Sequence, residues 1–273
     1  MHFRFWGVGS LNSSGRGFSL FNPRSVLSGG VFFIYNLHIM KKQGAFIVIE
    51  GTDGSGKATQ TKFLADKLAS LKIPFVLADF PQYGNPSSFF AEKYLRGEYG
   101  TAEEVGPYRG SIFYAVDRYD KSFDIRKALS EGKTVISNRY VSANMGHQAG
   151  KIKNPAEREK FLNWLLELEY DIFGIPKPDL TILLYVPPAV GQKFVDQKGE
   201  RSYTKGKKRD IHEADLKHLE DAAEAYLSVA KKYGWTVIDC SGKDGLMSLE
   251  EVRVRIWERV KKLLQLPDVG SKD

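Results

Sequence analysis

The sequence predicts an α/β protein in which helices cover both faces of a parallel, five-stranded sheet. Five short apolar runs predict the strands, and they cover residues 45–50, 74–79, 134–137, 180–186 and 235–239. Such runs are typical of strands buried on both faces. Segments with apolar residues at helical spacing lie between and after them, at residues 57–71, 107–130, 155–173, 188–197, 213–233 and 248–264. Strands and helices that alternate in this way predict a three-layer parallel sheet.

The composition fits a cytoplasmic protein with one sizeable core or two small ones. The chain has 273 residues, 42% of them hydrophobic, and no apolar run reaches the roughly 18–20 residues that span a bilayer. Cys240 is the only cysteine, which excludes a disulfide framework and a cysteine-based metal site. Of the net charge of +7, residues 1–39 contribute +3, so the remainder carries +4. This mild excess does not indicate a nucleic-acid partner, because a bound polyphosphate explains it as well.

Residues 1–39 differ from the rest of the chain. They are rich in Gly, Ser, Asn and Phe, contain no acid, and show no helical or strand period. They could be an organelle transit peptide, or an upstream stretch translated from a wrongly chosen start. Met40, close before the first predicted strand, favours the second interpretation. We expect this extension to be disordered or not native, a compact domain over residues 40–266, and a tail at residues 267–273.

The stretch G-T-D-G-S-G-K at residues 51–57 nearly matches the phosphate-binding pattern G-x-x-x-x-G-K-[ST]. It also lies between a predicted strand and a predicted helix, as that pattern requires. Glycines let the backbone amides turn toward an anion, the helix N-terminus adds its dipole, and Lys57 reaches the outer phosphates. We expect a nucleotide to contact this loop and the first helical turn, at Gly51, Thr52, Asp53, Gly54, Ser55, Gly56, Lys57, Ala58 and Thr59.

Ala58 breaks the pattern at the position whose hydroxyl normally reaches Mg²⁺. Thr59 carries a hydroxyl, but one residue further along a helix it points about 100° away. Because Mg²⁺ commonly keeps several waters, we expect it to depend on water, on the phosphates and on a carboxylate.

Polar and aromatic residues follow the second and third predicted strands and also lie on the helix predicted between them, and we expect all of them to face the sheet edge where ligands bind. Arg118 and Arg139 suit bidentate phosphate contacts. Tyr114 lies one helical turn before Arg118, so its ring can stack on a base while the arginine holds a phosphate. Asn144 and Gln148 can each donate and accept hydrogen bonds, as reading a base edge requires.

Simpler roles remain open for some of these residues. Tyr114 could be a core residue, and Arg118 could pair with Asp117 or Asp120 on the surface. His147 is expected to pack or to contact the base rather than to act as a catalytic base. The sequence shows no His/Cys/Asp cluster for a metal cage and no nucleophile elbow.

In this order and spacing, the motifs resemble those of the thymidylate kinase family, one of the P-loop nucleoside monophosphate kinases, over residues 44–265. The matching residues are Asp53 in the glycine loop, Phe80-Pro81, Tyr114 with Arg118, Asn138-Arg139-Tyr140 with Gln148, Lys177-Pro178-Asp179-Leu180 and Val186-Pro187-Pro188. The resemblance implies the P-loop kinase fold with a mobile lid, and phosphorylation of dTMP to dTDP by ATP in dTTP biosynthesis. It also implies Mg²⁺ as cofactor and a homodimer formed through helices packed beside the sheet.

The resemblance further implies roles for single residues. Asp53 would lie near the acceptor phosphate and the transferred group, and we expect it at the metal. Tyr114 would stack on thymine, Arg118 and Arg139 would hold the dTMP phosphate, and Gln148 would contact the thymine edge. The whole expected dTMP site comprises Phe80, Tyr83, Tyr114, Arg118, Arg139, Asn144 and Gln148.

The chain departs from the family pattern at four positions. Asn138 replaces an Asp, Tyr83 stands where some members carry a phosphate-contacting Arg, and Tyr185 replaces an Asp near the end of the fourth strand. Ala58 is the fourth departure. Together they bear on how Mg²⁺ is held more than on the substrate.

Residues 198–213 carry six basic and three acidic side chains with two glycines, which predicts a mobile loop. The loop could be a solvated surface segment. It could also be a lid that closes over ATP, excludes water and brings a cation to the transferred phosphoryl group. Family members without a basic residue inside the glycine loop place arginines in the lid, and this loop has none. We therefore expect Arg201 and Arg209 to act there.

These inferences predict an ATP-dependent dTMP kinase whose catalytic residues are Lys57, Asp53, Arg139, Arg201 and Arg209. Two alternatives remain open. One is a kinase for another nucleoside monophosphate or for a deoxynucleoside. The other is a nucleotide-binding module without transferase activity, which Ala58 and Asn138 suggest.

Overall fold

The computed structural model describes residues 43–196, 216–242 and 245–267. The chain divides into two units, residues 1–39 and residues 40–273, and every described residue belongs to the second. The expected extension, the expected lid at residues 198–213 and all but the first residue of the expected tail lie outside the described residues. What the sequence predicts for them stays a prediction.

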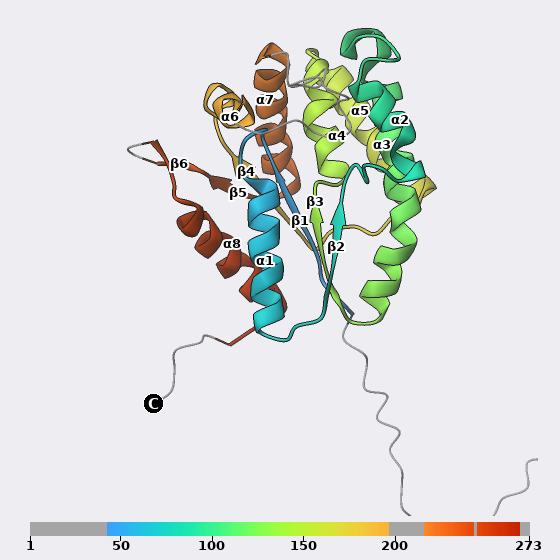
Figure 1. The fold of residues 1–273 in the computed structure, drawn as a ribbon. Coiled ribbons are helices and arrows are strands. Elements are labelled where there is room, and N and C mark those ends of the chain that lie inside the picture. Colours follow the sequence, from blue (N-terminus) through green and yellow to red (C-terminus); the bar gives the residue numbers. More distant parts are fainter. Residues whose placement is uncertain (1–42, 197–215, 243–244, 268–273) are drawn as a thin grey trace, which may run out of the picture. The chain divides into compact units, whose positions relative to one another are not determined.

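A five-stranded parallel sheet forms the centre of the domain, which confirms the predicted fold class (Figure 1). Its strand order is β2-β3-β1-β4-β5. The strands are β1 Phe46–Gly51, β2 Phe75–Asp79, β3 Thr134–Asn138, β4 Leu180–Tyr185 and β5 Thr236–Asp239, each within one residue of its predicted bounds. The central strand β1 is buried throughout, and its side chains alternate between two hydrophobic cores.

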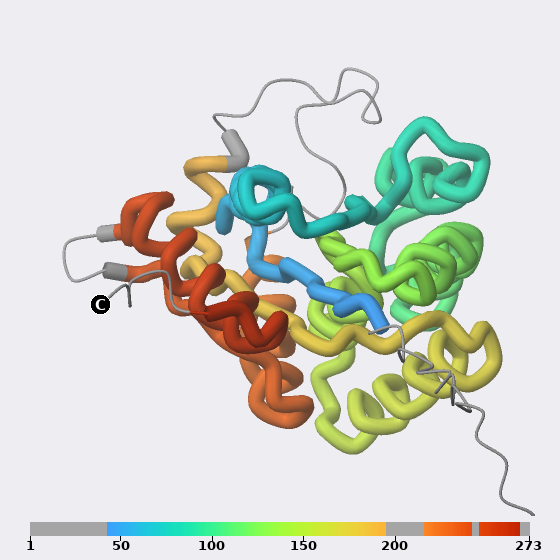
Figure 2. Tube along the Cα trace, turned by 90° about the horizontal axis from the view of Figure 1, so that it is seen from below, coloured from blue at the N-terminus to red at the C-terminus, as the bar shows by residue number. Residues whose placement is uncertain are grey.

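Helices cover both faces of the sheet (Figures 1 and 2). Helices α1 (Lys57–Ser70) and α8 (Leu249–Leu264) pack on one face, where Leu64, Leu68, Val252 and Ile256 bury Ile47 and Ile49 of β1. The other core joins Phe46 and Val48 of β1 to residues of α3 (Ala102–Ser130), α4 (Val141–His147), α5 (Pro155–Leu166) and α7 (Leu216–Tyr233). None of the described helices is both long enough and apolar enough to cross a membrane.

Several short elements differ from the prediction. Helix α3 begins at Ala102 rather than residue 107, because Thr101 and Glu104 form a capping box before the chain bends at Gly106. The helix predicted at residues 155–173 consists of two parts. The α-helix α5 ends at Leu166, and a π-helical segment, η3 (Glu167–Ile172), follows it directly. Helix α6 spans Pro188–Asp196, close to its predicted bounds. The unpredicted elements are α2 Phe89–Leu95, α4, η1 Pro86–Ser88, η2 Ala149–Lys151, and the strand pair β6 Ser241–Gly242 and β7 Gly245–Leu246.

The strand register aligns the carboxyl ends of three neighbouring strands. Asn138, the last residue of β3, pairs with Asp79 of β2 on one side and with Ile49 of β1 on the other. The segments that follow these strands therefore start side by side, at the upper edge of the sheet in Figure 1. This is the edge at which open parallel sheets bind ligands.

Candidate active site

The glycine loop connects β1 to α1, as the sequence predicts. Gly54 has a φ of 78°, and a Cβ placed on it would lie 2.2 Å from the carbonyl oxygen of Gly191 in α6. Only glycine fits there, because both the backbone conformation and the space exclude a side chain. Gly56 is the N-cap of α1 in the left-handed conformation and provides no side-chain cap, so the first amides of α1 can receive an anion.

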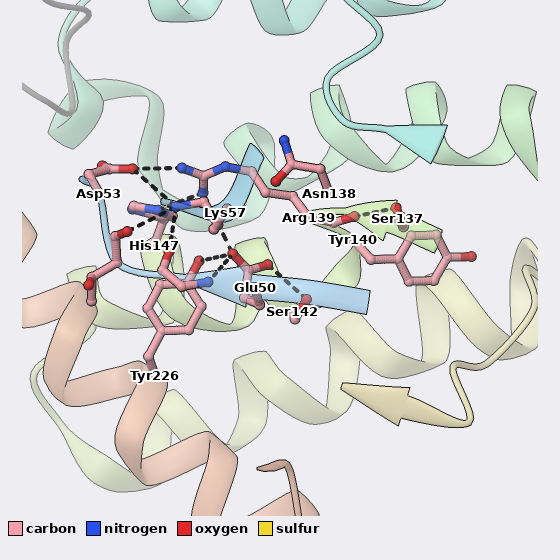
Figure 3. A network of polar contacts seen from close by, with 12 residues as sticks. Glu50, Asp53, Lys57, Ser137, Asn138, Arg139, Tyr140, Ser142, His147 and Tyr226 are labelled. Atoms are coloured by element: carbon pink, nitrogen blue, oxygen red, sulfur yellow. Dashed lines mark hydrogen bonds and ion pairs between the residues drawn. The ribbon is translucent and has the colours of Figure 1, made fainter. Parts of the chain in front are cut away.

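Lys57 folds back over this loop (Figure 3). Its Nζ donates hydrogen bonds to the carbonyl oxygens of Gly51 at 2.8 Å and Thr52 at 2.9 Å. The same atom lies 3.8 Å from Oδ1 of Asp53. The ammonium group is therefore held where the loop would bind a phosphate.

Arg139 bridges the glycine loop and α4. Its NH2 donates to Oδ1 of Asp53 at 2.7 Å, and its NH1 lies 3.0 Å from Nε2 of His147. Because a guanidinium group only donates, Nε2 of His147 must accept, which places the imidazole proton on Nδ1. Arg139 also has a φ of 65°, an uncommon backbone conformation for a residue with a side chain.

The charges around Asp53 decide its protonation state. Burial alone would raise the pKa of Asp53, but the positive charges of Arg139 and Lys57 hold that pKa well below its usual range. Burial also lowers the pKa of His147 well below its usual value, and the neighbouring Arg139 acts in the same direction. Asp53 is thus a carboxylate and His147 a neutral imidazole at neutral pH.

A buried carboxylate that the sequence reading missed lies beneath this network. Glu50 is fully buried and accepts hydrogen bonds from the hydroxyls of Ser142 at 2.8 Å and Tyr226 at 3.1 Å. Its Oε1 lies 3.9 Å from NH1 of Arg139. Glu50 thus ties the end of β1 to α4 and α7 directly below the arginine (Figure 3). A charged residue within an otherwise apolar strand is the signal that could have found it.

The ends of β2 and β3 hold a second pair of polar side chains. Nδ2 of Asn138 donates to Oδ1 of Asp79 at 2.8 Å. Asp79 is exposed at the end of β2, but the groups on its inner side partly shield the carboxyl group from water and raise its pKa, although the hydrogen bond from Asn138 opposes that rise. Oδ1 of Asn138 is buried and has no hydrogen-bond partner among the described residues. Figure 3 shows Asn138 next to Arg139.

The predicted base-binding residues gather between α3 and α4. Gln148 is 1% exposed, and its Oε1 is buried without a hydrogen-bond partner in the described part of the chain. A Cβ placed on Gly110 would lie 2.9 Å from that oxygen and 3.3 Å from the hydroxyl of Tyr94. Tyr114 is half-buried, and its ring meets that of Tyr94 edge to face at 6.1 Å. Asn144 is fixed by a bond from its Nδ2 to the carbonyl oxygen of Ser111 at 3.2 Å.

Arg118 has a partner that the sequence reading did not foresee. Its guanidinium group is 2% exposed and forms a buried ion pair with Glu169 of η3, while NH1 donates to the carbonyl oxygen of Tyr140 at 3.3 Å. A surface pairing of Arg118 with Asp117 or Asp120, which the sequence left open, is therefore wrong. Asp117 instead accepts hydrogen bonds from the segment after β2. The backbone N–H of Gln82 donates to it at 2.8 Å, and the side chains of Gln82 and Ser87 donate to it as well.

The remaining predicted site residues lie around this network or outside the described ranges. Phe80 is buried in the core against Tyr140, with ring centroids 5.7 Å apart, whereas Tyr83 is 39% exposed. In the glycine loop, Thr52 is fixed by a bond from its hydroxyl to the carbonyl oxygen of Val186 at 2.8 Å, and Ser55 is buried. Ala58 and Thr59 are exposed. The lid residues Arg201 and Arg209 lie outside the described residues.

The fold and this site define the class of protein. A parallel sheet of order 2-3-1-4-5, with a glycine loop and lysine between β1 and α1, is the architecture of a P-loop phosphotransferase. The family model "Thymidylate kinase" matches residues 49–248. The chain therefore belongs to the thymidylate kinase family, as its motifs suggested.

Individual relatives agree with this assignment. A probable thymidylate kinase from Pyrobaculum aerophilum is 31% identical over 223 residues, which cover 81% of this chain and 98% of the relative. A thymidylate kinase from Mycobacterium tuberculosis is 29% identical over 69% of this chain and 86% of its own length. The solved structure of thymidylate kinase from Candida albicans shares the fold, with a TM-score of 0.61, 22% identity and coverage of 81% of this chain and 92% of that one.

Proposed function

We propose that this protein transfers the terminal phosphoryl group of ATP to dTMP, yielding ADP and dTDP for dTTP biosynthesis. The observation that carries the proposal is the contact between the glycine loop and Arg139. A loop that holds the donor's phosphates and an arginine that can hold the acceptor's phosphate meet at Asp53. Family membership supports the same reaction.

The charges of the site suit phosphoryl transfer, in which catalysis is mainly positioning and electrostatic stabilisation. Lys57 and Arg139 now donate to loop carbonyls and to Asp53. A phosphate oxygen would give Lys57 an anionic acceptor in place of two neutral carbonyl oxygens, and it would give Arg139 a second anion beside the carboxylate of Asp53. Glu50, Asp53 and His147 fix the arginine from three sides and preserve its orientation.

The base pocket favours a base that presents a hydrogen-bond donor. Oε1 of Gln148 is a buried acceptor, and leaving such an atom unpaired costs about 1–3 kcal/mol. At ring position 3 thymine presents an N–H donor, whereas cytosine presents an acceptor there and carries its donor on the 4-amino group instead. Tyr114 adds a ring face on which the base can stack. The pocket therefore supports thymine over cytosine, and Arg118, oriented by Glu169, lies one turn further along α3.

The residues present fit a hydrated Mg²⁺ that is held mainly by ATP. The described ranges contain no group of three or more His, Cys, Asp or Glu side chains that could hold a metal ion. Asp53 supplies one carboxylate, and the unpaired buried oxygen of Asn138 supplies an acceptor at the same edge of the sheet. When bound, Mg²⁺ neutralises charge on the phosphates of ATP. Arg201 and Arg209 of the lid would add cations at the transferred group.

A homodimer also belongs to the proposal. Tyr108, Ile112, Tyr119 and Phe123 are each more than 40% exposed and lie within about 60° of the circumference of α3. An exposed apolar stripe of this kind marks an interface, and a two-fold axis would bring the same stripe of a second copy against it.

We place the protein in the cytoplasm, where the free, buried Cys240 would stay reduced.

A coupled assay of ADP release with a panel of acceptors tests the reaction. We expect turnover with dTMP to be far faster than with dCMP, dGMP or thymidine, in the presence of Mg²⁺. A flat profile or a preference for thymidine would support the alternative kinases. Binding of ATP without any dTMP-dependent ADP release would instead support a nucleotide-binding module.

A further inference from the structure

The phosphate site of this chain lacks two groups that P-loop phosphotransferases use around Mg²⁺. Such enzymes take a hydroxyl from the residue after the lysine and a carboxylate from a neighbouring strand. Here the residue after Lys57 is Ala58, and the two strands beside β1 end in Asn138 on β3 and Tyr185 on β4, neither of which is a carboxylate. The structure places a carboxylate, that of Asp79, at the end of β2, the strand beyond β3.

Asp79 lies directly beside Asn138 in the sheet. The two residues are register partners in β2 and β3, and Nδ2 of Asn138 donates to Oδ1 of Asp79 at 2.8 Å. Because a carboxylate can only accept, this bond fixes the orientation of the amide. It uses the donor end of Asn138 and leaves Oδ1 as the unpaired, buried acceptor.

Asp79 itself is available to a ligand. Its side chain is solvent-exposed, and it forms no salt bridge within the described ranges. Two cations of the phosphate site, Arg139 and Lys57, act on it electrostatically. The pair thus presents one negative charge and one unpaired oxygen at the phosphate-binding edge of the sheet.

We propose that Asp79 and Asn138 together replace the missing carboxylate at the end of β3 and accept hydrogen bonds from the water around ATP-bound Mg²⁺. Oxygen acceptors of this kind suit an ion that keeps several of its own waters. In this chain the negative charge lies at the end of β2, and the Asn138–Asp79 hydrogen bond joins it to the end of β3. The inference rests on the use of Mg²⁺ proposed above.

A purely structural role for the pair is the competing explanation. In that case the hydrogen bond would only join β2 to β3, and the position of the negative charge would not matter for the metal. Asp79→Asn separates the two explanations, because it removes the charge while two amides can still bond to each other. The exchange Asp79→Asn with Asn138→Asp restores one charge and one amide in swapped positions.

The experiment measures binding of Mn²⁺, as a spectroscopic substitute for Mg²⁺, to the full-length protein saturated with a non-hydrolysable ATP analogue. Electron paramagnetic resonance reports the free Mn²⁺. We expect Asp79→Asn to weaken Mn²⁺ binding at least tenfold, within the range of about 10–100-fold typical for residues that orient a metal's ligands. The double exchange should recover binding to within about threefold of the wild type. Asp66→Asn, which removes an exposed carboxylate on α1, serves as the matched control and should change nothing.

Two outcomes would overturn the inference: Mn²⁺ binding by Asp79→Asn equal to that of the wild type, or a double exchange as weak as Asp79→Asn. Thermal unfolding of each variant checks that the fold survives. If Asp79→Asn does not fold, Asp79→Ser, which also removes the charge and keeps a polar side chain, takes its place with the same expected loss, and wild-type Mn²⁺ binding by Asp79→Ser would overturn the inference. If the wild type phosphorylates dTMP in excess chelator, the proposed use of Mg²⁺ fails instead, whatever Mn²⁺ does.

Discussion

The buried ion pair between Arg118 and Glu169 makes a sharp prediction about stability. Arg118 is 2% exposed and Glu169 is fully buried, and Nε of the arginine lies 3.0 and 3.1 Å from the two carboxylate oxygens. Glu169→Gln keeps the volume and one acceptor oxygen but removes the negative charge. The guanidinium charge then stays buried without its counter-ion.

The expected cost follows from that burial. Breaking a buried pair by removing one partner typically costs about 3–5 kcal/mol. Because the amide introduced by Glu169→Gln would still accept one hydrogen bond, we expect the lower end of that range, about 3 kcal/mol. Domains of this kind unfold with roughly 5–15 kcal/mol, so the loss is a substantial part of the total. At about 2–4 °C per kcal/mol, the thermal midpoint should fall by about 6–12 °C.

Urea unfolding followed by circular dichroism measures this loss. Glu167→Gln is the matched control, because Glu167 lies two residues away on the same π-helical segment and is exposed, and it should change the free energy of unfolding by less than about 0.5 kcal/mol. The double variant Arg118→Met with Glu169→Leu should regain most of the stability, since no charge stays buried. Equal stability of Glu169→Gln and Glu167→Gln would refute the reasoning. If Arg118 also holds dTMP, the double variant will be stable yet show a raised KM for dTMP.

Three further predictions concern the base pocket, Lys151, whose Nζ donates to the hydroxyl of Tyr94 at 2.6 Å, and the dimer. Gln148→Leu should abolish the preference for dTMP over dCMP in the acceptor assay, and an unchanged ratio would contradict the base-reading role. Burial lowers the pKa of Lys151 to about 7. The pKa of a lysine in the unfolded chain is about 10.4, so between pH 7 and about pH 10 the unfolded chain binds more protons than the folded protein does. In this pH range the side chain of Lys151 should therefore make the free energy of unfolding rise with pH, by at most about 1.4 kcal/mol per pH unit. Urea titrations of Lys151→Met at pH 7, 8 and 9 should lack that rise, and a slope equal to the wild type's would contradict it. Ile112→Lys should convert a dimer into a monomer of 30.8 kDa in sedimentation analysis, and a monomeric wild type would contradict the proposed interface.

The sheet and the phosphate loop could be predicted because their signals are local. A strand buried on both faces needs only a short apolar run, and a phosphate loop needs glycines and a lysine at fixed spacing. All five strands accordingly lie within one residue of their predicted bounds. Helices α2 and α4 were missed because each spans only seven residues, too short for a helical period to stand out.

The polar networks could not be predicted, because they join residues far apart in the chain. Glu169 is 51 positions from Arg118, and Tyr226 is 176 positions from Glu50. Nothing in the local sequence distinguishes these partners from other acidic or aromatic residues. Asp79 was visible as an acid at a strand end, but its place beside Asn138 follows only from the register of β2 and β3.

The most direct test of the account is transfer of the labelled γ-phosphoryl group of ATP to dTMP, with the products separated by chromatography. The wild type should convert dTMP into labelled dTDP. Lys57→Met should lower turnover at least about 10²–10³-fold, as the loss of one charge-stabilising donor typically does, and should leave the fold intact. Absence of labelled dTDP with the wild type, or undiminished transfer by Lys57→Met, would contradict the account.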